Sequence, residues 1–557
     1  MVKRIFKVLN QEIGGLHEAA YLLAFFALLA QILALFRDRL FALYFGPSNI
    51  LDVYYAGFRI PDFIFTLFTS IVSISVLVPF LTERLNKSRE DGVKFINNIF
   101  SLFFLLIIVV SVVVFFLLPY FSATLFPGFT PEQVSQVIMV SRILLLSPIL
   151  LGISNFLASI TQVFKRFVIY SISPILYNVG IIAGIYFFYP LWGVAGLAVG
   201  VAFGALMHLA IQIPFVLKTG LMPRIQFFSW QIVKDAVLIS VPRALSISAS
   251  QLAIFAMVSI ASVLGVGAIS IFNFSYNLQS VPLSIIGVSY SIAAFPVMAR
   301  LFSEGKKEKF LEEIIASAKH IIFWSLPVLV LFIVLRAQIV RVIYGSGHFN
   351  WTDTRLTAAA LALFMISILA QSLNLLLLRA YYAMGNTKYP FWCNVGSAIL
   401  AVVLGLGFLK LLSIAPVFKY FLDSILRVED LPVTALLTLP LGFSLATIAG
   451  TWFMMIGLNR KFPGFIKSLF PSFFQGFSAA IIGGFAAYLG LNLLNGFVNL
   501  NTFMGIFLQG FGAGILGIIT SFVILLALGS EELNETWKTF HRKIWKAKPL
   551  PSEIREL

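Results

Sequence analysis

Charged residues and cysteine are scarce in this sequence. Only 11% of its 557 residues are charged, against about 25% in an ordinary soluble domain. The single cysteine excludes an intramolecular disulfide framework and a cysteine-based metal site. The five histidines are scattered and form no H-E-x-x-H or H-x-x-x-H pattern, so zinc hydrolysis has no support. A disulfide-stapled fold is therefore excluded, and a zinc hydrolase is not supported.

Apolar residues dominate instead. The chain is 60% hydrophobic and contains 58 phenylalanines, and its mean hydropathy is +0.97. Because a membrane-spanning helix needs about 20 apolar residues, the composition predicts an all-α polytopic membrane protein. The first apolar stretch begins near Ala19 and runs into Arg37 without a small-residue cleavage site, so no removable signal peptide is expected. About fourteen spans are expected, near 19–45, 51–81, 95–119, 134–162, 169–189, 192–217, 235–264, 268–299, 316–343, 356–384, 388–412, 435–458, 472–495 and 502–529.

The net charge of +16 is distributed along the chain in a way that predicts orientation. Lysine and arginine concentrate in the connections after even-numbered spans, so both termini are expected on the cytoplasmic side. There the basic residues would meet anionic lipid rather than nucleic acid. Two segments outside the spans look like interfacial amphipathic helices, the outer segment 412–433 and the basic tail from Glu531.

The sequence also contains an internal repeat. Residues 264–301 follow the plan of residues 45–85, with a glycine turn, an aromatic-rich helix, a serine-rich apolar stretch, a proline and a basic exit. Three residue pairs share nearly one spacing: Pro79 and Pro296 (217 positions), Gly128 and Gly345 (217), and Asn178 and Asn394 (216). This spacing covers about six spans, and an even number of spans per repeat preserves topology. Two parallel six-helix repeats around a central cavity are therefore expected, as in secondary transporters.

The repeat also sets the expected domain organisation. The expected parts are an N-lobe of spans 1–6 (1–230), a C-lobe of spans 7–12 (231–465), two extra helices (466–530) and a cytoplasmic basic tail (531–557).

Charged side chains gather where lipid is expected, in the first two spans. Arg37, Asp38 and Arg39 end a long apolar run, and Arg59 and Asp62 follow across a short turn. At about 1.5 Å per residue, they lie roughly 10–14 Å below the surface of a core about 30 Å thick. An isolated charge there costs roughly 2.5–3.5 kcal/mol. Pairing of the two aspartates with the three arginines would leave one net positive charge. Two interpretations remain open: a structural ion-pair cluster, or the wall of a cavity whose arginine forks receive an anionic group such as phosphate.

Other polar residues within the spans have two interpretations each. Arg142 either lines the cavity or extends to the outer surface. Arg243 either anchors to lipid head groups or contacts the substrate. Gln251, Asn273 and Asn277 bond neighbouring helices more often than they bind ligands.

The stretches "FRDRLFALYFG" and "LDVYYAGFRIPDF", with the later "SPILYNVGII" and "LLRAYYAMGNTKYP", resemble the MurJ/MviN family of lipid II flippases in the MOP transporter superfamily. The resemblance covers roughly residues 15–530. It implies export of an undecaprenyl-pyrophosphate-linked disaccharide-pentapeptide across the bacterial inner membrane. It also implies that cavity arginines receive the pyrophosphate and that the two extra C-terminal helices shape a groove for the lipid tail.

The resemblance also assigns residues. Arg37, Asp38 and Asp52 match family motif positions, Arg59 stands where a basic residue is usual, and Asn277 replaces a family arginine. The complete expected substrate-binding set is Arg37, Asp38, Asp52, Arg59, Asp62, Arg142, Arg243 and Asn277. We expect a transporter that works as a monomer by alternating access, without a metal or cofactor, coupled to the membrane potential or to an ion.

Three alternative functions remain open at this stage. The first is a flippase for another lipid-linked oligosaccharide. The second is a MATE-like multidrug antiporter, which would carry organic cations and would require a more acidic cavity. The third, an enzyme that transfers sugar from a lipid-linked donor, is disfavoured because the outer connections are short or apolar.

Overall fold

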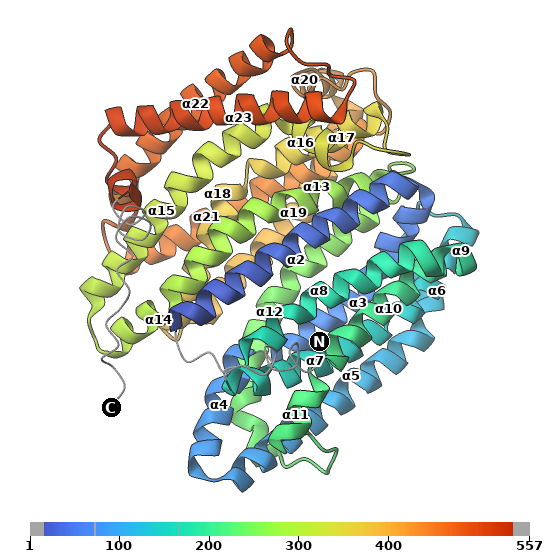
Figure 1. Ribbon diagram of the computed structural model, residues 1–557, viewed down its shortest axis with the longest axis vertical. Coiled ribbons are helices and arrows are strands. Elements are labelled where there is room, and N and C mark those ends of the chain that lie inside the picture. The colour runs from blue at the N-terminus through green and yellow to red at the C-terminus, as the bar shows by residue number, and fades with distance from the viewer. Residues whose placement is uncertain (1–15, 72–73, 165, 538–557) are drawn as a thin grey trace, which may run out of the picture. The chain divides into compact units, whose positions relative to one another are not determined.

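The computed structural model describes residues 16–71, 74–164 and 166–537, and all regular structure in these ranges is helical (Figure 1). The helices of the first half are α2 (Leu16–Phe45), α3 (Asn49–Ile71), α4 (Ile74–Lys87), α5 (Arg89–Leu125), α6 (Pro131–Leu144), α7 (Leu146–Val163), α8 (Phe167–Ala183), η1 (Gly184–Phe188), α9 (Tyr189–Trp192), α10 (Val194–Ala210), α11 (Ile213–Thr219), α12 (Trp230–Ala261) and α13 (Ala268–Leu283). The second half contains η2 (Ser284–Val288), α14 (Ser289–Ser303), α15 (Lys307–Val334), α16 (Arg336–Tyr344), α17 (Trp351–Met365), α18 (Ile368–Ala383), α19 (Lys388–Ile414), α20 (Pro416–Leu426), η3 (Thr434–Leu437), α21 (Thr438–Lys461), α22 (Phe465–Leu494) and α23 (Phe503–Ala527).

The predicted class, a helical polytopic membrane protein, is confirmed. Among the described residues, ten helices are long and apolar enough to cross a membrane, and the bent pair α17–α18 makes an eleventh. The three remaining expected spans correspond to α2, the α3–α4 segment and α12. The helices α2, α3 and α12 contain 30, 23 and 32 residues, enough to cross a core of about 30 Å. Each of the fourteen expected spans therefore coincides with a helix or a helix pair.

Contacts within the chain define two compact units. The first contains Met1–Val281, Ile343–Phe364 and Asn386–Gly450, and the second contains Pro282–Val342, Met365–Gly385 and Thr451–Leu557. These units reflect how tightly the helices pack and do not test where one repeat ends and the next begins. The lobe boundaries at residues 230 and 465 therefore remain a prediction.

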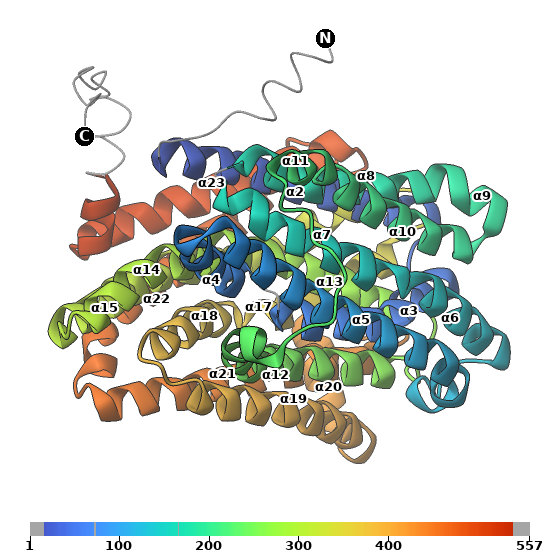
Figure 2. The same cartoon turned by 90° about the horizontal axis from the view of Figure 1, so that it is seen from below.

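In the first unit, glycines bring helices α8 and α10 into close contact. A Cβ atom added to Gly200 would lie 2.4 Å from the Cα atom of Gly184, and one added to Gly180 would lie 2.2 Å from the Cα atom of Gly204. Small residues at four-residue spacing let two backbones approach closely in a membrane. Helix α8 also packs along α2, and both views show the two side by side (Figures 1 and 2).

Four connections of the first unit interlock in two exchanged contacts. The turn after α2 contacts the loop before α17, where the His348 backbone N–H donates to the Leu43 carbonyl at 3.1 Å. The loop after α5 contacts the turn after α12, where the Gly128 N–H donates to Ser262 Oγ at 3.4 Å. The two contacts correspond under the repeat spacing of 217 positions: Leu43 corresponds to a position near Ser262, and His348 to a position near Gly128. The exchange is what two copies of one repeat would form around an axis between them.

In the second unit, helices α15, α22 and α23 pack together. Close approach again depends on small residues, because a Cβ atom on Gly483 of α22 would lie 2.7 Å from the Gly517 carbonyl of α23. The short helical segment after α23 closes this unit, with Glu532 accepting hydrogen bonds from Ser472 and Ser530. The tail expected to continue as a basic helix to Leu557 lies outside the described residues beyond position 537.

Candidate functional site

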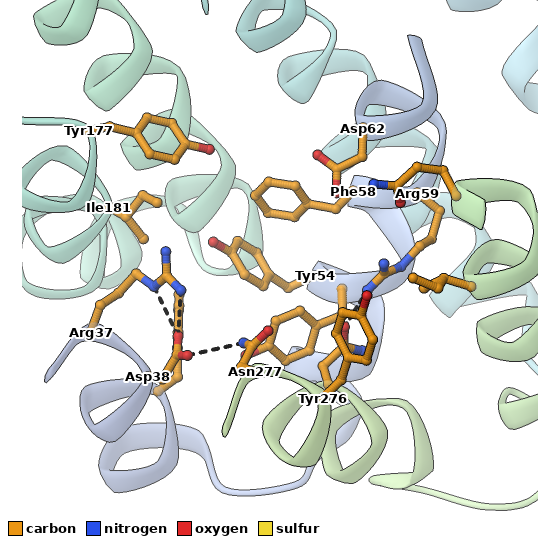
Figure 3. Close-up of a pocket in the computed structure, with 15 residues that line it drawn as sticks. Arg37, Asp38, Tyr54, Phe58, Arg59, Asp62, Tyr177, Ile181, Tyr276 and Asn277 are labelled. Atoms are coloured by element: carbon orange, nitrogen blue, oxygen red, sulfur yellow. Dashed lines mark hydrogen bonds and ion pairs between the residues drawn. The ribbon is translucent and has the colours of Figure 1, made fainter. Parts of the chain in front are cut away.

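The site lies within the first unit, where helices α2, α3, α8, α12 and α13 meet around a cavity of about 240 Å³. Figure 3 shows side chains from α2, α3, α8 and α13 facing one another across it. The lining residues are Arg37, Asp38, Phe41, Tyr54, Tyr55, Phe58, Arg59, Asp62, Tyr177, Ile181, Gln251, Ile254, Asn273, Tyr276 and Asn277. Five of the eight predicted site residues are in this set.

Arg37 and Asp38 form an ion pair at one side of the cavity. Arg37 donates from Nε and Nη2 to Asp38 Oδ1 at 2.9 and 2.7 Å. Its remaining nitrogen Nη1 donates to Asn178 Oδ1 on α8 at 2.9 Å, while Asn277 on α13 donates to the second carboxylate oxygen of Asp38 at 3.0 Å. The pair therefore connects α2 to two other helices, and the Arg37 side chain keeps 20% of its surface exposed.

Arg59 lies on α3 on the other side of the cavity (Figure 3). Its Nη2 donates to Asn273 Oδ1 on α13, and its Nε is buried with no hydrogen-bond partner among the described residues. Asp62 lines the cavity less than one turn further along α3. Because a buried donor without a partner is costly, the free Nε of Arg59 is a prepared site for an acceptor.

Two asparagines hold these guanidinium groups in the same way. Asn178 donates from Nδ2 to the Pro174 carbonyl four residues earlier, at 3.0 Å, and presents Oδ1 to Arg37. Asn273 donates from Nδ2 to the Ile269 carbonyl at 2.7 Å and presents Oδ1 to Arg59. The hydrogen bond to the backbone carbonyl fixes the orientation of each side-chain amide, so that each Oδ1 faces one arginine.

The structure corrects the charge expected for the cavity. The sequence suggested one net positive charge, counting Arg39 with Arg37 and Arg59 against two carboxylates. Arg39 instead donates to the Ile343 carbonyl at 3.5 Å and does not line the cavity. Among the residues that the structure describes, the four charged lining residues sum to a formal charge of zero, so their preference for an anion depends on the placement of donors rather than on net charge.

Asp52 lies outside the cavity lining. Its carboxylate accepts hydrogen bonds from the backbone N–H groups of Gly267 and Ser270, at 2.6 and 2.8 Å, and from the Ser270 hydroxyl at 2.6 Å. Those N–H groups begin helix α13, where an acidic side chain is favourable. Asp52 therefore ties α3 to the first turn of α13.

The remaining two predicted residues have different outcomes. Arg142 donates from Nε to the Phe115 carbonyl at 3.2 Å and lies over the Phe115 ring. It does not line the cavity, and this position favours the surface interpretation. Arg243 lies in α12, and its side chain is outside the described part of the structure.

Sequence reasoning missed the aromatic part of the lining. Tyr54, Phe58 and Asp62 follow one another at four-residue intervals on α3, and Tyr177 and Tyr276 add rings from α8 and α13. A stripe of tyrosine, arginine and aspartate at helical spacing in an otherwise apolar span was the available signal. The Tyr55 hydroxyl is buried without a partner and is a further potential donor beside the arginines.

This fold, that of a helical membrane protein with an internal polar cavity, is similar to the folds of two solved transporters. An inward-facing MATE family multidrug resistance transporter of the MOP superfamily is 16% identical with a TM-score of 0.61, over 78% of this chain and 96% of that one. A structure of the lipid II flippase MurJ in an inward closed conformation is 21% identical with a TM-score of 0.70, over 93% of this chain and 100% of that one.

The sequence comparisons define the family within that class. The family model described as "Lipid II flippase MurJ" matches residues 41–509. A probable lipid II flippase MurJ from Buchnera aphidicola subsp. Acyrthosiphon pisum is 27% identical over 383 residues, covering 67% of this chain and 74% of the relative. The chain belongs to the MurJ family, and it is a multi-pass membrane protein.

Proposed function

We propose that this protein is a flippase that carries lipid II, an undecaprenyl-pyrophosphate-linked peptidoglycan precursor, from the inner to the outer leaflet of the bacterial inner membrane. Family membership and the names of the relatives support this proposal. Within the chain, the supporting observation is the pair of arginines at one cavity within the first unit. Two planar guanidinium groups suit an anion with two phosphates.

Binding would begin with an exchange of partners. Asp38 occupies the Nε and Nη2 edge of Arg37 in this conformation, and a phosphate that binds this edge displaces Asp38. The buried Nε–H of Arg59 can donate directly to a phosphate oxygen. The cavity of about 240 Å³ lies below the usual range of about 300–1,000 Å³ for ligand sites. This conformation therefore has room for the phosphates but not for the disaccharide-pentapeptide.

The proposed transport cycle is alternating access. The end of the first unit near the α2–α3 turn is held shut by the three Asp52 hydrogen bonds and the two exchanged loop contacts. If the lysine and arginine distribution sets the orientation, this end faces outward and both termini face the cytoplasm. Opening outward would then break the Asp52 bonds to α13, which gives Asp52 a gating role rather than a role in binding the cargo.

The test is complementation of a bacterial strain depleted of its own lipid II flippase. The native chain should restore growth, and Arg37→Ala should abolish rescue while remaining folded in the membrane. Arg37→Lys keeps the charge but loses the fork, so rescue should be partial. Arg142→Ala is the matched control, because it removes an arginine outside the cavity and should rescue normally.

The same strain distinguishes the alternatives. Normal rescue by Arg37→Ala would contradict the proposed cargo site. Failure of the native chain to restore growth, combined with resistance to cationic drugs, would contradict the flippase proposal and favour an antiporter.

A further inference from the structure

One connection in the second repeat is longer than its counterpart in the first. In the first repeat, Gly184 packs against Gly200, 16 positions later. A comparable glycine contact in the second repeat joins Gly405 to Gly442, 37 positions apart. The second connection is therefore longer, and its extra residues include α20 and the loop to η3.

Helix α20 is strongly two-faced. One stripe, at three- and four-residue spacing, is apolar apart from a tyrosine hydroxyl and open: Val417, Tyr420, Phe421 and Ile425 are 79%, 70%, 57% and 60% exposed. The opposite stripe, Leu422 and Leu426, is buried. Four large side chains left open on one face form the kind of patch that marks an interaction surface.

The extra segment, α20 with the loop to η3, is held in place by hydrogen bonds to α17. Arg355, in the first turn of α17, donates to both carboxylate oxygens of Asp430 and to the Arg427 carbonyl. These hydrogen bonds hold the pKa of the Asp430 carboxyl below its usual range, so the ion pair persists at neutral pH. At the end of the segment, Val433 adopts a left-handed backbone with φ of 64°, which a β-branched residue adopts only when its surroundings hold it there.

The open face of α20 continues the open face of α19. Helix α19 has the smallest buried share among the ten candidate spans of the described chain, 11%. Its exposed side chains Val403, Leu406 and Ile414 lead to the break at Ala415. Beyond the break, Phe418 of α20 stacks on Phe408 of α19, and Figure 2 shows α20 beside the end of α19. A spanning helix so open on its sides borders lipid.

We propose that α20 is an interfacial helix whose face of Val417, Tyr420, Phe421 and Ile425 inserts among the lipid head groups where α19 leaves the membrane. An amphipathic helix lying in that plane buries its apolar face roughly 5–10 Å deep, and tyrosine is favoured at that depth. The Arg355–Asp430 clamp makes the anchor rigid, so α20 fixes the depth of this end of the first unit in the bilayer.

The test measures immersion depth by spin labelling in vesicles of phosphatidylethanolamine and phosphatidylglycerol. Cys393 is first replaced by serine, and single cysteines are then placed at Val417, Phe421 and Ile425. Val403 on α19 is the lipid-facing control, and Glu429 on the exposed loop is the water-facing control. Collision of each label with oxygen, which concentrates in lipid, is compared with collision with a water-soluble nickel chelate.

The ratio of oxygen to nickel collisions should be severalfold higher at the three α20 positions than at Glu429, and lower than at Val403. Ratios equal to the Glu429 value would overturn the proposal. So would exclusion of both reagents, or spin–spin broadening between copies, since either would mean that protein covers the face. Asp430→Asn should increase label mobility at Phe421, and unchanged mobility would overturn the clamp. Lipid II transport does not enter these measurements, so they stand or fall apart from the proposed flippase function.

Discussion

At the residue scale, each cavity arginine donates a hydrogen bond to an asparagine, and that asparagine is in turn bonded to a backbone carbonyl of the asparagine's helix. Removing the Asn178 amide leaves Arg37 with Asp38 as its only described side-chain partner. Because a hydrogen bond to a charged group contributes roughly 1.5–3 kcal/mol, Asn178→Ala should weaken binding of a pyrophosphate-bearing lipid by about tenfold or more. Binding is measured by titration of the purified protein in detergent.

The matched control for that variant is Asn98→Ala. Asn98 also donates to a carbonyl four residues earlier and accepts a backbone N–H through Oδ1, but it lies on α5 away from the cavity. Both variants should lower the unfolding temperature, and only Asn178→Ala should lower affinity. Equal affinities for the two variants would show that Asn178 only supports folding.

In the proposed cycle Asp38 competes with the cargo for Arg37, so replacement of Asp38 should have two opposite effects. In Asp38→Asn the Arg37 charge loses its ion-pair partner, which destabilises the empty protein. The same change frees the Arg37 fork for phosphate. We expect a lower unfolding temperature without ligand, a larger stabilisation by pyrophosphate lipid, and slower transport because release is hindered. Weaker lipid binding by Asp38→Asn would contradict the exchange of partners.

At the element scale, span positions could be predicted from the sequence and their interior geometry could not. Runs of about 20 apolar residues fix where α5, α22 and α23 lie, because only a helix satisfies the backbone in lipid. The π-helical segments η1 and η2 interrupt apolar runs without any break in hydropathy. The charged residues of the cavity could be predicted from the sequence, because Arg37 and Arg59 lie within apolar runs, where an isolated charge is unfavourable. Their asparagine partners lie 141 and 214 positions away, and a single sequence does not reveal such pairing.

The glycine contact between α8 and α10 makes a prediction at this scale. Gly200→Leu forces a side chain against the backbone of α8, and overpacking of this kind typically costs about 1–3 kcal/mol or more. The yield of folded protein in the membrane should fall several-fold, measured by fluorescence-detected gel filtration. Gly407→Leu is the control, since a Cβ there meets nothing within 4 Å. Equal loss in both variants would mean that added bulk in any span is harmful and that the contact is not special.

At the scale of the whole molecule, the neutral charge of the described lining predicts which step of the proposed cycle responds to voltage. Arg37 with Asp38 and Arg59 with Asp62 carry no net formal charge, so these residues move no net charge when the empty protein changes between its inward-open and outward-open states. The loaded step moves the negative charge of the cargo, and each charge gains about 2.3 kcal/mol per 100 mV. In the proposed outward direction, a potential that is negative inside accelerates this step.

Collapse of the membrane potential with valinomycin and external potassium should therefore slow appearance of lipid II in the outer leaflet, and collapse of the pH gradient alone should not. Asp62→Asn tests the role of the lining charge. This variant leaves one net positive charge among the described lining residues, which offsets part of the negative charge of the cargo. Its loaded step should respond less to voltage than that of the native chain. An equal transport rate with and without the membrane potential would contradict this prediction. It would mean that a co-transported ion balances the negative charge of the cargo.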